Sequence, residues 1–265
     1  HKIFNNSDII SDKIKKSKKP IVIIGESALS GNKGQYIFEE IKKFLINNNF
    51  INENWNGLNI LVQNASTVGL LDLNIVKELK EKNSSFFDDL NNKKFKLLYL
   101  LGSDNLEFQK NNEFIVYQGS HGDRGAEVAD IIFPSATYTE QNGLYENLEG
   151  RIQECKKASY PIGEALEDWK ILNQIIKKLG FKDKTSKFDD LRKEVFETVP
   201  NFSELNALPK KSKFKKDNIE KNFFSEKIQI RELDYYYTNS ISRSSKTMSE
   251  CRQIRQKIKK DGTNN

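Results

Sequence analysis

One glycine-rich loop carries the side chains best suited to chemistry in this chain. The loop, GSHGDRG, covers residues 119–125 and contains His121, one of two histidines in the sequence. A loop histidine flanked by glycines could act as a general base or as a ligand. An aspartate and an arginine follow it, and we recognise no nucleophile paired with it in the loop. We therefore favour a hydrogen-bonded turn residue at His121.

Three carboxylates follow this loop and offer a second possible site. Glu140, Glu146 and Glu149 are near enough in sequence to form an acid–base or metal-binding group. Nothing in their spacing fixes their mutual distances. Glu140 is equally suited to cap a helix or to pair with Arg151, and we favour this structural role.

Metal centres of the common types are not expected in this chain. Its two cysteines, Cys155 and Cys251, are far apart and form no closely spaced pair. Structural zinc sites and iron–sulfur clusters need about four ligands, usually in such pairs. We expect no metal and no cluster here. Two isolated cysteines instead fit free thiols in a reducing compartment.

A second glycine-containing turn lies between an apolar run and a helical pattern. Residues 25–34 read GESALSGNKG, and Gly25 ends the apolar run. Such a turn can hold a phosphate with its backbone amides. Its spacing matches neither the dinucleotide fingerprint nor the phosphate loop, so we favour a simple turn.

Charge and hydropathy narrow the range of partners. The chain of 265 residues has a formal net charge of +6 and a pI near 9.0. A basic chain can bind nucleic acid, an anionic membrane or an acidic protein. Because lysine and asparagine are abundant together with isoleucine and phenylalanine, we attribute the charge to compositional drift and expect no nucleic-acid role. No apolar stretch is long enough for a membrane span.

Short apolar runs alternate with helical patterns along most of the chain. Such alternation predicts an α/β fold, with a mostly parallel sheet and helices on both faces. The expected strands, buried on both faces, are residues 20–25, 58–62, 96–102, 114–119 and 130–134. The expected helices cover 36–45, 164–180 and 188–199.

The helix at 164–180 has the strongest pattern, with one apolar stripe ending at the cap Gly180. The expected stripe consists of Leu166, Trp169, Leu172, Ile176 and Leu179. Residues 144–153 are polar and broken by glycine, and we expect irregular structure there.

Composition divides the chain into four segments. They are a polar lead-in (1–19), an α/β domain (20–181), a helix with a charged linker (182–230) and a docking tail with a basic helix (231–265). The tail is rich in tyrosine, which suits an interface. Its interface candidates are Tyr235, Tyr236, Tyr237, Ile241, Arg243 and Met248.

Residues 129–153 resemble the shared motif of the molybdopterin oxidoreductases. The matching residues are ADIIFP at 129–134, TE at 139–140, Gly143, Asn147, EGR at 149–151 and Gln153. With YQGSHGDRGA before this motif and YYYTNSISRSSKTMSECRQ in the tail, residues 20–257 resemble the C-terminal part of the largest iron–sulfur subunit of respiratory complex I, NADH:ubiquinone oxidoreductase.

The resemblance implies a scaffold that has lost its cofactor. It implies no catalytic residue and no cofactor in this chain, with the iron–sulfur clusters in a companion N-terminal part. The implied partners are other complex I subunits, at the matrix side of the mitochondrial inner membrane. Enzyme activity then belongs to the complex. The candidates for a vestigial cofactor loop are Gly25, Gly119, His121, Gly122, Glu140 and Arg151.

Two alternatives remain open. The first is an oxidoreductase module that retains a molybdopterin or a nucleotide in the loops at 25–34 and 119–125. The second is a basic binder of RNA or of a membrane surface, acting through residues 209–221 and 252–260.

Overall fold

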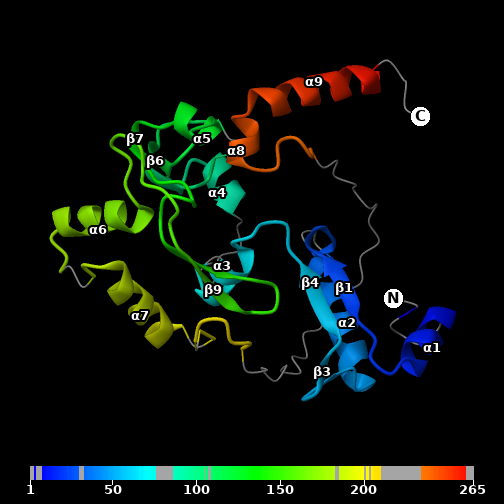
Figure 1. Cartoon of the computed structure of the whole chain (residues 1–265). Helices are drawn as coiled ribbons and strands as arrows, with labels where there is room; N and C mark the ends of the chain where they lie inside the picture. The colour runs from blue at the N-terminus through cyan, green and yellow to red at the C-terminus, as the bar shows by residue number, and fades with distance from the viewer. Residues whose placement is uncertain are drawn as a thin grey trace. The chain divides into compact units, whose positions relative to one another are not determined.

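The chain divides into two compact units in a computed structural model (Figure 1). The first unit comprises His1–Ile75, Leu144–Glu154 and Lys193–Ile228, and the second comprises Val76–Gly143, Cys155–Arg192 and Gln229–Asn265. The structure describes residues 3, 8–29, 33–75, 86–104, 106, 109–182, 185–199, 201–202, 204–209 and 234–260. The four segments expected from composition stay a prediction.

A two-stranded parallel sheet forms the centre of the first unit. Strand β1 (Val22–Gly25) pairs with β4 (Leu58–Leu61), and helix α2 (Gly34–Asn47) lies between them in sequence. Phe44 and Leu45 of α2 pack against these strands in the core. The short strands β2 (Ile51–Asn52) and β3 (Trp55–Asn56) pair antiparallel, and η1 (Glu26–Ala28) and α3 (Thr67–Asp72) complete the unit's N-terminal segment.

The lead-in also contains a regular element. Helix α1 (Ile9–Lys16) begins after Asp8, whose carboxylate accepts a hydrogen bond from the Ile10 amide at 2.8 Å. Ile14 of this helix packs against the core of the first unit. The polar lead-in thus contains a helix that Asp8 caps and that Ile14 attaches to the core. The sequence did not indicate this helix because the segment is rich in lysine.

A strand pair replaces the irregular structure expected over 144–153. Strands β8 (Gly143–Glu146) and β9 (Ile152–Cys155) form a two-stranded sheet. Ile152 is buried with Val199 and Phe202, which follow helix α7 (Phe188–Thr198). The expectation was wrong for residues 144–146 and 152–153, because only one buried apolar side chain, Ile152, marks β9, whereas residues 147–151 form the turn between the two strands.

A three-stranded parallel sheet forms the centre of the second unit. Its order is β5 (Leu97–Leu101), β6 (Phe114–Gly119) and β7 (Ile131–Pro134). Helices α4 (Phe86–Asn91) and α5 (Arg124–Glu127) precede β5 and follow β6. The α/β class with parallel sheets is confirmed, and the five expected strands are divided between two sheets.

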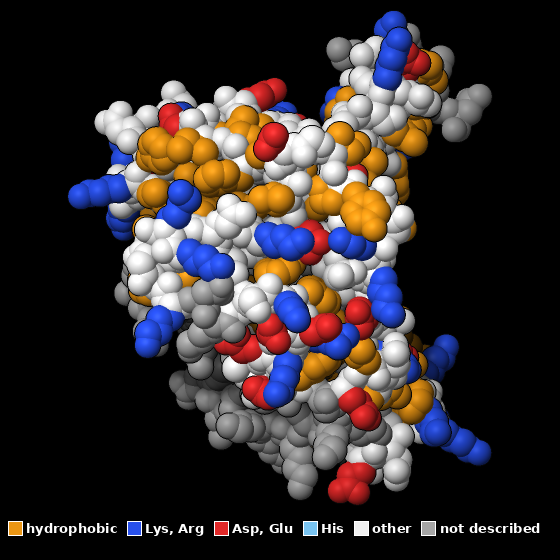
Figure 2. Space-filling view, turned by 60° about the vertical axis from the view of Figure 1, so that its left-hand side comes forward, with side chains coloured by type: hydrophobic (Ala, Val, Ile, Leu, Met, Phe, Trp, Pro, Cys, Tyr) orange, Lys and Arg blue, Asp and Glu red, His pale blue; other side chains and the backbone are white. Residues whose placement is uncertain are grey.

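Several strands are not buried on both faces, as the sequence had suggested. Ile23 in β1 is 64% exposed and Leu97 in β5 is 56% exposed, although their neighbours Ile24 and Leu98 are buried. On the face of the molecule drawn in Figure 2, hydrophobic side chains reach the surface between charged ones. A run of apolar residues does not reveal whether anything packs on the second face.

Helix α6 (Asp168–Lys178) is shorter than expected and buries a different side. Leu166 forms a parallel bridge with Ser135 instead of a helical turn, which delays the start of the helix. Ile171 is the buried residue, whereas Ile176 and Leu179 of the expected stripe are exposed. Gly180 has a φ of +83°, as expected for a helix-ending glycine.

The C-terminal segment contributes two helices to the second unit. Helix α8 (Ser240–Arg243) starts with a capping box, in which the Asn239 side chain accepts from the Ser242 amide. Helix α9 (Lys246–Lys260) follows and runs outward in Figure 1. Among the described residues, no helix combines the length and apolar character that crossing a bilayer requires.

Candidate functional site

Two polar clusters lie at the end of strand β6, where α/β folds usually bind their ligands. Tyr117 and Gln118 are consecutive residues near the end of this strand, and both are buried. Because successive side chains on a strand point to opposite faces, each residue organises a cluster of its own.

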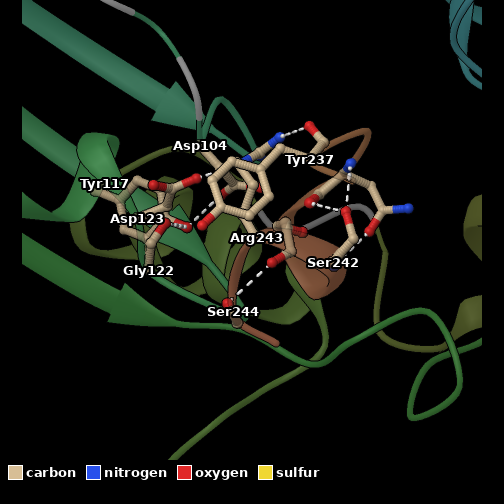
Figure 3. Close-up of polar contacts among 10 residues, drawn as sticks. Asp104, Tyr117, Gly122, Asp123, Tyr237, Ser242, Arg243 and Ser244 are labelled. Atoms are coloured by element: carbon tan, nitrogen blue, oxygen red, sulfur yellow. Dashed lines mark hydrogen bonds and ion pairs between the residues drawn. The ribbon is translucent and has the colours of Figure 1, made fainter. Parts of the chain in front are cut away.

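Tyr117 forms the centre of the first cluster (Figure 3). Its hydroxyl donates a hydrogen bond to the carboxylate of Asp104, which lies just after β5. The same hydroxyl lies 2.9 Å from the carbonyl oxygen of Gly122 in the loop after β6. Burial, together with the hydrogen bond to Asp104, raises the pKa of Tyr117. The phenol therefore stays protonated at physiological pH and holds the two loops together.

The glycines of the loop make room for this tyrosine. A Cβ atom on Gly119 would lie 2.1 Å from the Tyr117 hydroxyl oxygen. A Cβ atom on Gly125 would lie 2.9 Å from Tyr117 Cδ2 and 2.8 Å from the Ser103 carbonyl oxygen. All three distances are well below ordinary contacts of a carbon atom. The ring of Tyr117 thus occupies the space that the absence of these side chains leaves.

Asp123 has an unusual backbone conformation in the same loop. Its φ is 77° and its ψ is −164°, a region that is essentially restricted to glycine. Its carboxylate forms an ion pair with the guanidinium of Arg243, at the end of α8. Figure 3 shows Arg243 reaching this loop from the C-terminal segment, with its guanidinium also near the Tyr237 carbonyl oxygen. From the sequence we expected Arg243 to pair with a carboxylate of a partner or of the α/β domain, and the structure shows the second, with Asp123 as the carboxylate.

The Tyr117 cluster is poorly suited to hold the phosphate of a pterin cofactor. A phosphate site needs free backbone amides and cationic side chains. Here the Gly125 amide donates to the Asp104 carbonyl oxygen at 3.1 Å, and the Asp104 and Asp123 carboxylates lie around the loop. The Asp123 carboxylate already pairs with the guanidinium of Arg243, and the Asp104 carboxylate adds a negative charge that disfavours a bound anion.

The second cluster lies on the opposite face of the sheet and consists of four side chains, those of Tyr99, Gln118, Gln141 and Asp168. The Tyr99 hydroxyl donates to the Gln118 side-chain oxygen at 2.5 Å, and Gln118 Nε2 donates to Asp168 Oδ1 at 2.7 Å. Gln141 exchanges two hydrogen bonds with Asp168, through its side chain and the Asp168 amide. Burial, followed by the negative charge of Asp168, raises the pKa of Tyr99.

Sequence reasoning did not identify this second cluster. Its signal is a glutamine, Gln118, at the end of an otherwise apolar strand. A buried side-chain amide needs hydrogen-bond partners, and the two partners of Gln118, Tyr99 and Asp168, come from separate parts of the chain. Because these four side chains bond to one another, the cluster forms an internal contact between β5, β6 and α6.

His121 lies beside the first cluster and contacts its own loop. Its Nδ1 atom lies 2.7 Å from the Ser120 hydroxyl oxygen. Glu140, in turn, accepts a hydrogen bond from the Thr137 amide at 3.1 Å. His121 therefore contacts a hydroxyl that could act as a nucleophile, which we did not recognise from the sequence, whereas Glu140 contacts a backbone amide.

Glu146 is the most unusual carboxylate in the first unit. It is buried beside Asp72 of α3, and its Oε2 atom has no hydrogen-bond partner among the described residues. Burial, followed by the charge of Asp72, raises the pKa of Glu146 to about 7. Glu149 lies in the turn between β8 and β9 and is exposed. The two are therefore in different environments.

The remaining candidates do not assemble into a metal or phosphate site. In the described part of the chain, no three histidine, cysteine or acidic side chains are placed to hold a metal ion. Cys155 and Cys251 are free thiols in β9 and α9. Gly25 ends β1, and residues 30–32 of its loop lie outside the described residues.

The tail residues expected at an interface have different environments. The rings of Tyr235 and Tyr237 lie under the guanidinium groups of Arg255 and Arg252, at 5.5 and 4.5 Å. Tyr236 is half-buried. The exposed members of the set are Tyr235, Ile241 and Met248.

Comparison with known proteins identifies the family. Residues 2–178 match the family model described as molybdopterin oxidoreductase, which is well over half of the chain. The chain belongs to the molybdopterin oxidoreductase family. Residues 198–251 match a second model, described as the C-terminal part of the G subunit of NADH-ubiquinone oxidoreductase.

Relatives of this molybdopterin oxidoreductase chain include subunits of NADH oxidoreductases. It is 38% identical over 249 residues to the NADH-ubiquinone oxidoreductase 75 kDa subunit of Reclinomonas americana, covering 91% of the chain and 35% of that subunit. It is 36% identical over 253 residues to the G subunit of the NADH-quinone oxidoreductase of Rickettsia bellii, covering 95% and 36%. The mitochondrial 78 kDa subunit of Neurospora crassa is 34% identical over 252 residues, covering 90% and 32%. The chain spans about a third of the length of these relatives.

The motif residues of the molybdopterin oxidoreductase family secure backbone in this chain. Asp130 accepts from the Ile115 amide at 2.8 Å and pairs with Lys110, and the hydrogen bond from Lys110 lowers its pKa. The side-chain oxygen of Asn147 accepts from the amides of Glu149 and Arg151 in the turn between β8 and β9. Arg151 itself donates to the Asn206 carbonyl oxygen at 2.6 Å. Each of these three motif residues thus holds a backbone group of its own chain in place.

Proposed function

We propose that this chain is a non-catalytic structural part of the matrix arm of respiratory complex I. It would support a companion part that carries the iron–sulfur clusters and passes electrons from NADH towards ubiquinone. The relatives described above, all named as subunits of NADH-ubiquinone or NADH-quinone oxidoreductases, support this assignment. Their greater length leaves room for such a companion part.

One observation carries the non-catalytic assignment. The ring of Tyr117 fills the space between Gly119 and Gly125 at the strand ends, where this fold class binds ligands. The carboxylates of Asp104 and Asp123 add negative charge at the same place. Both features disfavour an anionic cofactor, so we infer that the chain binds no molybdopterin and contributes no active site.

The proposed partners are other complex I subunits, first the cluster-bearing N-terminal part. The proposed location is the matrix side of the mitochondrial inner membrane, without a membrane span of the chain's own. Relatives named as mitochondrial subunits support this location. Nucleic acid is not among the proposed partners.

A purification experiment tests the proposal. An affinity tag on this chain should recover an assembly that contains an iron–sulfur protein and oxidises NADH, while molybdenum stays well below one atom per chain by mass spectrometry. Recovery of the chain with stoichiometric molybdenum or a fluorescent pterin would instead favour the cofactor-binding alternative. Salt-sensitive retention on RNA, with no NADH-oxidising assembly, would favour the basic binder.

Deletion of residues 231–265 tests the docking tail. We expect the α/β part to remain folded, although it loses the ion pair between Arg243 and Asp123, and we expect assembly to weaken. Circular dichroism monitors folding, and native gels monitor assembly. Normal assembly with the shortened chain would rule out a docking role.

A further inference from the structure

Helix α9 carries a narrow apolar stripe that reaches the surface. Met248 is 39% exposed, Ile254 is 59% exposed and Ile258 is 46% exposed. Together with Cys251, these residues recur every three or four positions, so they lie on one side of the helix. Cys251, Ile254 and Ile258 have the spacing by which helices anchor in grooves of partner proteins.

A different side of α9 is fixed to its own chain. Arg252 forms an ion pair with Asp234 and lies over the ring of Tyr237, and Arg255 lies over the ring of Tyr235. In an α-helix Arg252 and Arg255 lie about 40° from Met248 and Cys251, respectively, whereas Ile254 lies about 100° or more from both arginines. Residues 234–237, called the tyrosine segment from here on, therefore contact α9 on one flank and leave Ile254 exposed to solvent.

The charge of α9 indicates what kind of surface it fits. Its 15 residues, KTMSECRQIRQKIKK, contain six lysines and arginines but only one glutamate. The stripe contains no tryptophan, phenylalanine or leucine, the residues that interfacial membrane helices usually bury. A second copy of α9 would bring like charges together. These features favour a protein groove over a lipid surface or self-association.

We propose that α9 docks its Cys251–Ile254–Ile258 stripe into an apolar, acid-rimmed groove on another protein subunit. The carboxylates of that rim would pair with the basic side chains beside the stripe. The proposal rests on the proposed function in one respect only, namely that complex I is the assembly whose subunit provides the groove. It assigns the contact to α9, whereas the tyrosine segment serves mainly to orient the helix.

Site-specific photocrosslinking in the assembled complex tests the proposal. A photoreactive phenylalanine analogue replaces Ile254, and the matched control carries it at the exposed Gln256, on about the opposite side of α9. We expect Ile254 to crosslink a different polypeptide at least about fivefold more than Gln256 does, because only the stripe enters the groove. The crosslinked peptide should contain apolar residues flanked by aspartate or glutamate.

Substitutions provide a second readout. Ile254→Asp should weaken incorporation of the chain into its assembly about tenfold or more, whereas Gln256→Asp should leave it nearly unchanged. Circular dichroism of both variants controls for folding. Adducts on lipid or on a second copy of this chain, equal adducts from both positions, or no adduct at Ile254 would each overturn the proposal. A protein adduct in an assembly that is not complex I would overturn the proposed function but would still support docking of α9 into a groove of another protein.

Discussion

The guanidinium of Arg243 pairs with the carboxylate of Asp123, 120 positions earlier in the chain. Both side chains are mostly buried, with 14% and 21% of their surface exposed. The pair joins the C-terminal segment to the loop in which the family resemblance implies a former cofactor site. Arg243 thereby places a positive charge of the chain's own in the loop that resembles a cofactor site.

This ion pair should make a measurable contribution to stability. Replacing Arg243 or Asp123 with alanine, singly and together, should give a coupling energy of about 1–3 kcal/mol, because the pair is largely shielded from water. Urea unfolding of the four proteins measures it. The exposed pair Lys193–Glu197, whose side chains are 77% and 64% exposed, is the matched control and should give under about 0.5 kcal/mol. Equal coupling in both pairs would contradict the assignment.

The backbone conformation at Asp123 should favour glycine over alanine when the ion pair with Arg243 is absent. In the Arg243→Ala background, Asp123→Gly should be more stable than Asp123→Ala by about 1–3 kcal/mol, since glycine adopts a φ of 77° and a ψ of −164° without a steric penalty. Thermal or urea unfolding of the two double variants provides the comparison. If alanine is as stable as glycine, the loop does not hold this conformation.

The close approach between Gly119 and Tyr117 predicts a steric cost. Gly119→Ala should destabilise the second unit by about 1–3 kcal/mol or more, because the new methyl group would overlap the phenol. A smaller residue in place of Tyr117 should recover part of this loss. Gly25→Ala is the control, since its Cβ would meet only Ser27 Oγ, at 3.8 Å. Similar losses at both glycines would argue against this packing of the tyrosine ring.

Glu146 should make stability depend on pH near neutrality. Its pKa is raised to about 7 in the folded state, so the folded chain retains a proton that the unfolded chain has already lost. Its contribution is therefore complete below about pH 4.5 and is lost as the pH rises to about 7, with a slope of at most about 1.4 kcal/mol per pH unit. Glu146→Gln should remove this slope and stabilise the chain at pH 8.

Urea unfolding at pH 5, 6, 7 and 8 measures the effect. The exposed Glu149 provides the control, because Glu149→Gln should keep the wild-type pH profile. An unchanged profile for Glu146→Gln would show that Glu146 ionises normally in the folded chain.

The sequence by itself determined the fold class and the five strands of the two parallel sheets, but not β2, β3, β8 or β9. Each of these five strands is a mostly apolar run, and such runs are local signals that survive without knowledge of their partners. The bounds of α7 and the cap at Gly180 were also predicted, because helix ends depend on a few neighbouring residues. The motif over residues 129–153 was sufficient to indicate the family.

Only the tertiary structure decided which polar side chains meet. Tyr117 reads as one more apolar residue of β6, and its contact with Asp104 depends on where the next loop lies. The pair Arg243–Asp123 and the cluster of Gln118, Asp168 and Gln141 join segments far apart in sequence. Hydrophobic periodicity records which side of an element is buried, but it does not record which distant residue lies across from it. That choice is made by packing, and it converts a loop that resembles a cofactor site into one that holds an arginine of its own chain.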